Sequence, residues 1–174
     1  MKNPYVVGRW VRGDEHYDRQ SLIEHLLHSH DTAIWVVGTR RMGKTSLLRQ
    51  IEHVTSQPDS PYVPIFWDLQ GHATAEQLTE ELCWAIETAT DHFDSSQLDW
   101  TQMRTWEAAV ILRRLSRLVQ QQQRTLLLLV DEAEVLLEIG QSDPGWLARL
   151  RKTLQEGQLR TIIASTRMLS QLTD

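Results

Sequence analysis

The segment that most constrains the fold of this chain is Gly38–Thr45, with the sequence Gly-Thr-Arg-Arg-Met-Gly-Lys-Thr. It matches the pattern G-x-x-x-x-G-K-[ST] at every fixed position. An apolar run, Ala33–Val37, precedes it, and apolar residues at helical spacing follow it from about Lys44 to Thr55. A glycine-rich loop between a buried strand and a helix is the setting in which proteins hold phosphate groups. The segment therefore predicts an α/β domain with a phosphate-binding loop.

The residue types in this loop suit a bound anion. Gly38 and Gly43 allow tight backbone turns, so that successive N–H groups can point at one phosphate. The free amides and dipole of the following helix add to this attraction. We expect Lys44 to reach the outer phosphates of a nucleotide and the Thr45 hydroxyl to bind Mg²⁺. The predicted phosphate-binding residues are Gly38, Thr39, Arg40, Arg41, Met42, Gly43, Lys44, Thr45 and Ser46.

Two carboxylates, Asp131 and Glu132, directly follow the apolar run Leu126–Val130. Ligands of parallel sheets bind at the carboxyl ends of the strands. We therefore expect Asp131 to hold Mg²⁺ together with Thr45, and Glu132 to orient and deprotonate an attacking water. Many strands end in acidic turns, so this interpretation depends on the glycine-rich loop earlier in the chain.

Polar residues also follow the apolar run Val63–Leu69. Asp68 and Gln70 lie on one face of that expected strand by alternation. Gln70 is the better candidate to hold an ionised Glu132 away from water, because a second carboxylate would repel it. An ordinary polar turn at a strand end is the alternative.

A further cation, Arg167, follows the expected strand Arg160–Ser165. A side chain at this position would lie between the glycine-rich loop and the acidic pair. Arg167 is predicted to bind the terminal phosphate bidentately, which lysine cannot do. The alternatives are that it caps the next helix or pairs with a surface acid.

The remaining pattern alternates strands with helices. This order implies crossover connections and a parallel sheet covered on both faces, hence a three-layer α/β domain. Residues 91–101 are predicted to form a polar loop. Strands are expected at 33–37, 63–69, 125–130 and 160–165, and helices around 22–27, 44–55, 78–89, 108–119 and 144–155.

Composition excludes several classes of protein. The 174 residues carry a formal net charge of -5, which gives no support for nucleic-acid binding through bulk charge. A single cysteine, Cys83, excludes a disulfide scaffold and a cysteine-rich zinc site. No apolar run approaches a membrane span, and the N-terminus lacks the apolar core of a secretory signal. We predict a soluble cytoplasmic domain with no membrane partner.

Other clusters have simpler explanations than a functional site. Three histidines near residues 25–30 lack matching acidic or thiol ligands, so a solvated helix end is favoured over a metal site. The seven tryptophans are scattered, which favours packing over base stacking. A set of basic residues could form faces for a partner or DNA, although a solvated helix face is the safer interpretation: Arg113, Arg114, Arg117, Arg149, Arg151 and Lys152.

Four segments together resemble P-loop ATPases of the STAND and AAA-like class. They are Asn3–Arg9, Tyr17–Leu22, Gly38–Leu48 and the strand end Ser165–Arg167. The resemblance implies a P-loop NTPase core of the additional-strand type, with strand order 5-1-4-3-2, adenine packed against the N-terminal segment and a nucleotide-driven switch. The chain departs from that class at Asp18, where glycine is usual, and in lacking an evident fifth strand and helical lid. We expect the first strand, 33–37, to form an exposed sheet edge.

The expected activity is Mg²⁺-dependent ATP binding and slow hydrolysis to ADP, with Lys44, Glu132 and Arg167 as catalytic residues. We expect residues 1–174 to form an ATPase domain, an N-terminal piece of a longer signalling or defence protein in which it acts as a switch. Partners are ATP, other domains of that chain and, as a further candidate, a nucleotide-dependent homo-oligomer. A DNA-handling ATPase, a switch that scarcely hydrolyses and a small-molecule kinase are open alternatives. The absence of an Asn-Lys-x-Asp motif argues against a GTPase.

Overall fold

A parallel four-stranded sheet forms the centre of the computed structural model, which describes residues 20–156 and 159–166. Its strands lie in the order β1-β4-β3-β2. This order confirms the predicted 1-4-3-2 arrangement. Within the described ranges β1 pairs with β4 alone, so it forms one edge of the sheet as expected. The strands are β1 (Ala33–Val37), β2 (Tyr62–Asp68), β3 (Thr125–Asp131) and β4 (Arg160–Ser165).

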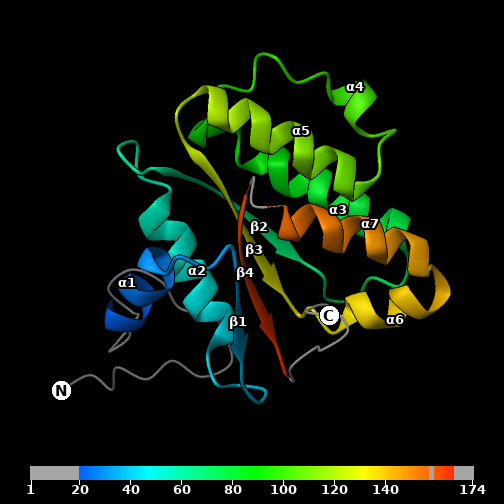
Figure 1. The fold of residues 1–174 in the computed structure, drawn as a ribbon, viewed down its shortest axis with the longest axis horizontal. Helices are drawn as coiled ribbons and strands as arrows, with labels where there is room; N and C mark the ends of the chain where they lie inside the picture. Colours follow the sequence, from blue (N-terminus) through cyan, green and yellow to red (C-terminus); the bar gives the residue numbers. More distant parts are fainter. Residues whose placement is uncertain (1–19, 157–158, 167–174) are drawn as a thin grey trace.

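Helices cover both faces of this sheet, giving three layers (Figure 1). One face carries α1 (Gln20–His28) and α2 (Lys44–Thr55). The other carries α3 (Ala75–Thr88), α5 (Ala108–Gln121) and α7 (Pro144–Gln155). The predicted three-layer α/β fold is therefore confirmed.

Strand β3 shows why the core has two halves. Its side chains alternate, so Leu127 and Leu129 pack on the side of α2, while Leu128 and Val130 pack on the side of α5. All four are at most 1% exposed. A strand buried on both faces needs a continuous apolar sequence, which this segment has. Its first polar side chains come where it leaves the core, at Asp131 and Glu132.

Hydrogen bonds from Arg124 and Arg160 fix the opposite, amino end of the sheet. The Arg124 guanidinium donates to the carbonyl oxygens of Ser60, Tyr62 and His92. Burial lowers the pKa of Arg124. Arg160 donates to the carbonyls that end α1 and begin the next turn, those of Leu26 and Ser29. These two arginines fasten loops at one end and leave the carboxyl end to the candidate site.

The structure departs from the predicted elements at three places. The segment 91–101, expected to be a polar loop, contains most of a 3-10 turn, Thr90–His92, and the start of a short helix, α4 (Trp100–Met103). The Asp99 side chain caps α4 by accepting from the backbone N–H of Gln102. A helix that was not predicted, α6 (Val135–Ser142), follows the acidic pair. The second strand begins and ends one residue earlier than expected, because Tyr62 already pairs with Thr125.

The helices also bear on the membrane prediction. In the described part of the chain, no helix is both long and apolar enough to cross a membrane.

Candidate functional site

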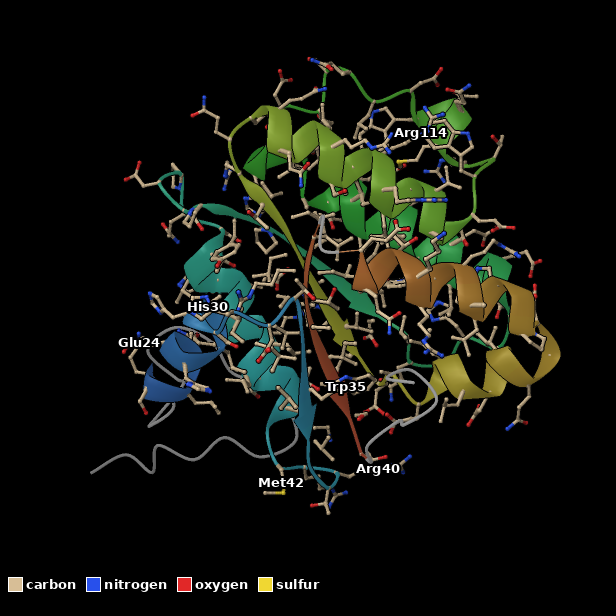
Figure 2. All side chains as sticks on the ribbon, in the orientation of Figure 1. Glu24, His30, Trp35, Arg40, Met42 and Arg114 are labelled. Carbon is tan, nitrogen blue, oxygen red and sulfur yellow. The ribbon has the colours of Figure 1, made fainter. Side chains whose placement is uncertain are left out.

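The glycine-rich loop joins β1 to α2 at the carboxyl end of the sheet. Figure 2 shows Arg40 and Met42 in this loop, below the end of β1. Backbone angles in the left-handed region occur at Arg41, with φ 66°, and at Gly43, with φ 80°. The conformational freedom of glycine is therefore used at Gly43. Gly38 does not adopt a positive φ, so the chain at this residue does not use the left-handed conformation that glycine allows.

Lys44 is the most enclosed charged side chain of the loop. It is 8% exposed, and its ammonium group donates to the carbonyl oxygens of Gly38, at 2.8 Å, and Thr39, at 3.3 Å. A methyl group on Gly38 would lie 3.9 Å from Lys44 Cδ and 3.6 Å from Met42 Sδ, in ordinary contact. The backbone of the loop thus surrounds a positive charge, which can attract the negative charge of a phosphate group.

Thr45 and Asp131, the two predicted metal ligands, meet in the structure. The Thr45 hydroxyl and the Asp131 carboxylate share a hydrogen bond, and the backbone N–H of Glu132 donates to Asp131 Oδ1 at 3.0 Å. Burial raises the pKa of Asp131 and these hydrogen bonds oppose the rise; the charge of Asp68 adds to it, and that of Lys44 opposes it. A buried carboxylate in this situation is stabilised by a nearby cation.

The donor atoms at this point fit Mg²⁺ bound together with a nucleotide. A hydroxyl and a carboxylate are the hard oxygen ligands that Mg²⁺ takes, and it commonly completes its shell with water and phosphate oxygens. Among the described residues, no group of three or more His, Cys, Asp and Glu side chains gathers to form a metal cage. Thr45 and Asp131 would therefore hold the metal together with phosphate and water oxygens.

Glu132 lies in a strained turn beside Asp131. Its φ is 53°, which a non-glycine residue adopts only when its surroundings enforce it. When it carries a proton, its side chain donates a hydrogen bond to the carboxylate of Glu134, and when both groups are ionised they repel each other. Burial raises the pKa of Glu132, the charges of Glu134 and Asp131 add to this, and Lys44 opposes it.

Glu134 was not identified from the sequence, yet it joins two parts of the site. Its Oε1 accepts from the Thr166 hydroxyl at 2.7 Å, and its Oε2 accepts from the Thr166 backbone N–H at 3.3 Å. Burial alone would raise the pKa of Glu134, but the hydrogen bonds from Thr166 and from its own backbone lower it. The alternation Glu132-x-Glu134 was the one signal that the sequence offered.

The predicted contact of Gln70 with Glu132 is not what the structure shows. Gln70 is exposed, and its backbone N–H donates to Asp68 Oδ1 at 3.0 Å in a turn after β2. Gln70 lies beyond the last residue of the strand, so strand alternation does not govern its direction. The side chain that lies beside Glu132 is instead that of Glu134, the residue that precedes α6.

The end of β4 contacts both loops of the site. The Ser165 carbonyl accepts from the Gly38 N–H at 3.2 Å, and the Ala164 carbonyl accepts from the Ala133 N–H at 3.1 Å. The strand end thus lies between the glycine-rich loop and the acidic pair, as predicted. Arg167 and the N-terminal segment expected to contact adenine lie outside the described residues.

The predicted basic faces are partly neutralised within the chain. Arg149 makes a two-pronged ion pair with Glu107, at 2.7 and 2.9 Å. The Arg114 guanidinium, labelled in Figure 2, lies 4.1 Å from the centre of the Trp106 ring. Two of the six basic side chains are thus engaged in contacts within the chain.

A cavity of about 680 Å³ lies between the starts of α3, α5 and α7. Its lining includes Cys83, Trp106 and Trp146 together with several acidic side chains. Burial raises the pKa of Cys83, so its thiol is not activated as a nucleophile. None of the lining residues belongs to the glycine-rich loop or to the acidic pair.

Comparison with known proteins agrees with this geometry. The structure is similar to the Walker-type ATPase PABY2304 of Pyrococcus abyssi, with a TM-score of 0.70 and 21% identity over 94% of this chain. This chain spans 49% of the length of that one. PCH-2 of C. elegans is 13% identical, with a TM-score of 0.44 over 88% of this chain and 37% of its own. A comparison with curated proteins gives no match. The family model of the AAA domain matches residues 25–172, most of the sequence, and the chain therefore belongs to the AAA domain family.

Proposed function

We propose that this domain binds ATP with Mg²⁺ and hydrolyses it to ADP and phosphate. One observation carries the proposal: Lys44 lies enclosed within the glycine-rich loop while its neighbour Thr45 is hydrogen-bonded to Asp131. A cation for the phosphates and oxygen ligands for a metal thus stand side by side. Membership of the AAA domain family supports the same activity.

The residues have separate roles in this proposal. The amides of residues 38–46 bind the phosphates, Lys44 neutralises charge on the outer phosphate oxygens, and Thr45 and Asp131 hold the metal. Bound Mg²⁺ supplies charge stabilisation for the phosphoryl group. Glu132 takes a proton from a water molecule as its oxygen bonds to the terminal phosphorus. The bond from that phosphorus to the bridging oxygen breaks, and ADP leaves with the bonding electrons.

Slow turnover is part of the proposal. An arginine placed at the transition state typically contributes about 10³ to 10⁵ in rate, and such a residue is often supplied by a neighbouring domain or subunit. We propose Arg167, or an arginine from a partner, for this role. The domain then acts as a switch within a longer protein of signalling or defence type, and residues 1–174 form its ATPase domain.

The decisive experiment separates binding from hydrolysis. Glu132→Gln retains the shape of the side chain but removes the base, so ATP affinity should stay within about twofold while hydrolysis falls at least tenfold. Glu138→Gln is the matched control, because Glu138 is an exposed acid on α6. Unchanged phosphate release by Glu132→Gln would contradict the role of this carboxylate.

A further inference from the structure

The cavity between the starts of α3, α5 and α7 has no place in the proposed function. Its volume of about 680 Å³ falls within the range of about 300–1,000 Å³ that is usual for ligand sites. The three helices cover the face of the sheet opposite α2 (Figure 1), and the cavity lining contains no residue of the glycine-rich loop. The cavity therefore offers a place for a ligand other than the nucleotide.

The charged groups that line the cavity are mostly acidic. They are four carboxylates and one guanidinium: Glu76, Glu80, Glu107, Asp143 and Arg104. An excess of carboxylates repels the phosphate groups of a nucleotide and attracts a cation. The charge of the lining thus favours a positively charged ligand.

Ion pairs within the chain already engage two of these groups. The Glu107 carboxylate accepts two hydrogen bonds from Arg149, at 2.7 and 2.9 Å, and Arg104 pairs with Glu87. Arg149 and Glu87 do not themselves line the cavity. Glu87 thus balances the one positive charge of the lining, and the acids of α3 remain without a counter-charge.

Those acids, Glu76 and Glu80, lie one turn apart on α3, and both are exposed. Neither takes part in an ion pair or a side-chain hydrogen bond with another residue that the structure describes. Like charges at this spacing repel each other and weaken a helix. A cation bound between the two carboxylates would be attracted by both and would offset this repulsion.

Tryptophan rings add apolar surface at the same place. Trp106 lines the cavity, and the Arg114 guanidinium lies 4.1 Å from the centre of its ring, because the face of an aromatic ring attracts cations. Trp84 is 59% exposed and follows Glu80 by four residues on α3, so these two side chains are neighbours. Tryptophan is enriched where proteins contact each other. The apolar surface beside the acids thus suits a ligand that is longer than a single side chain.

We propose that the cavity binds a lysine or arginine side chain of a polypeptide partner, with the charged end of that side chain between Glu76 and Glu80. The aliphatic part of the side chain packs along the cavity wall, as long basic side chains do on apolar surfaces. An apolar residue next to it in the partner covers Trp84. The partner is therefore a segment in which a basic residue has apolar neighbours, and its binding requires neither ATP nor Mg²⁺.

The test uses the full chain without nucleotide and a set of labelled nine-residue peptides, each with a central lysine or arginine between two leucines or two phenylalanines. Fluorescence anisotropy should show saturable binding of at least one peptide. Glu76→Gln combined with Glu80→Gln should weaken this binding at least tenfold, because two charge-assisted hydrogen bonds lose their charge. The matched control combines Glu24→Gln with Glu138→Gln, which changes the net charge equally at exposed acids of α1 and α6, and it should bind like the unmodified chain.

Two further comparisons test the charge and the apolar contact separately. A peptide with norleucine in place of the basic residue should bind at least tenfold more weakly. Trp84→Ala should weaken binding about fivefold or more, whereas Leu22→Ala, at an exposed apolar residue of α1, should leave it unchanged. The proposal is overturned if no peptide binds, if the norleucine peptide binds equally well, or if either the paired glutamine variant or Trp84→Ala binds like its control.

Nuclear magnetic resonance then locates the bound peptide. The indole N–H signals of Trp84 and Trp106 should shift on addition of peptide, while that of Trp35, on the edge strand β1, should not. Shifts confined to other tryptophans would contradict binding at the cavity, and equal binding of lysine amide alone would contradict a polypeptide partner. Because no nucleotide is present, these results do not depend on whether Glu132 acts in ATP hydrolysis, so the two proposals can fail separately.

Discussion

The ammonium group of Lys44 lies 2.8 Å from the carbonyl oxygen of Gly38, at the opposite end of the glycine-rich loop. This bond closes the loop upon itself, because the first and seventh residues of the motif are in contact. The charge is largely removed from water but is satisfied by two carbonyl oxygens. Incoming phosphate oxygens would replace neutral acceptors by charged ones, and charge-assisted hydrogen bonds are the stronger kind.

Replacing Lys44 by alanine should weaken ATP binding by about 10- to 100-fold, since a hydrogen bond to a charged group contributes about 1.5–3 kcal/mol. Isothermal titration calorimetry measures this affinity. Lys152→Ala is the control, because Lys152 is an exposed lysine of α7. Equal ATP affinity in Lys44→Ala and the unmodified chain would exclude Lys44 from phosphate binding.

Replacing Thr45 by valine should remove the benefit of Mg²⁺ for ATP binding. Valine keeps the branched shape but loses the hydroxyl that is hydrogen-bonded to Asp131. ATP titrations with Mg²⁺ and with a chelator measure the difference, which should shrink at least fivefold in Thr45→Val and persist in Thr45→Ser. A full Mg²⁺ effect in Thr45→Val would place the metal elsewhere.

Replacing Asp131 by asparagine should stabilise the nucleotide-free domain at pH 7. The unfolded chain ionises this group near its ordinary pKa of 3.8, whereas burial raises the pKa in the folded state. The folded state therefore binds more protons between the two pKa values, and stability falls as the pH rises through that window. Asparagine removes this penalty, so Tm should be higher than that of the unmodified chain at pH 7, and the gain should shrink as the pH falls and vanish near pH 4. Thermal unfolding across this range tests it, with the exposed Asp59→Asn as control; equal Tm at pH 7 would contradict it.

Replacing Arg124 by alanine should lower the free energy of unfolding by about 2–4 kcal/mol. Three carbonyl oxygens would lose charge-assisted hydrogen bonds, and a half-buried position would lose its packing. Urea unfolding followed by circular dichroism measures the change. Arg117→Ala on the exposed side of α5 should cost less than about 0.5 kcal/mol. A loss below 1 kcal/mol in Arg124→Ala would show that other contacts hold these loops.

How much the sequence predicted depends on whether a feature is contiguous in the chain. The loop Gly38–Thr45 and the pair Asp131–Glu132 are local patterns, and the structure brings Lys44, Thr45, Asp131 and Glu132 to one end of the sheet as expected. The strand order was also predictable in its 1-4-3-2 part, although that expectation came from resemblance and not from periodicity.

Features that join distant segments were missed. Glu134 owes its importance to Thr166, and no spacing rule connects a helix start to a strand end over that distance. Helix α6 is not predicted, because its short apolar pattern follows directly after the acidic pair. Strand alternation predicts a side-chain direction for Gln70, but β2 ends at Asp68 and the rule does not apply beyond the strand.

The position of β4 in the sheet also determines when this domain can fold. Ala33, on the strand that leads into the glycine-rich loop, pairs with Thr161, near the other end of the described chain. Strands β2 and β3 can pair once residue 131 has been synthesised, but β1 must wait for β4 to be inserted between it and β3. Such long-range pairing slows folding, because the entropy of closing the loop is lost before the contacts form. On the ribosome, the phosphate-binding loop is thus made well before β4, the strand that completes its native support.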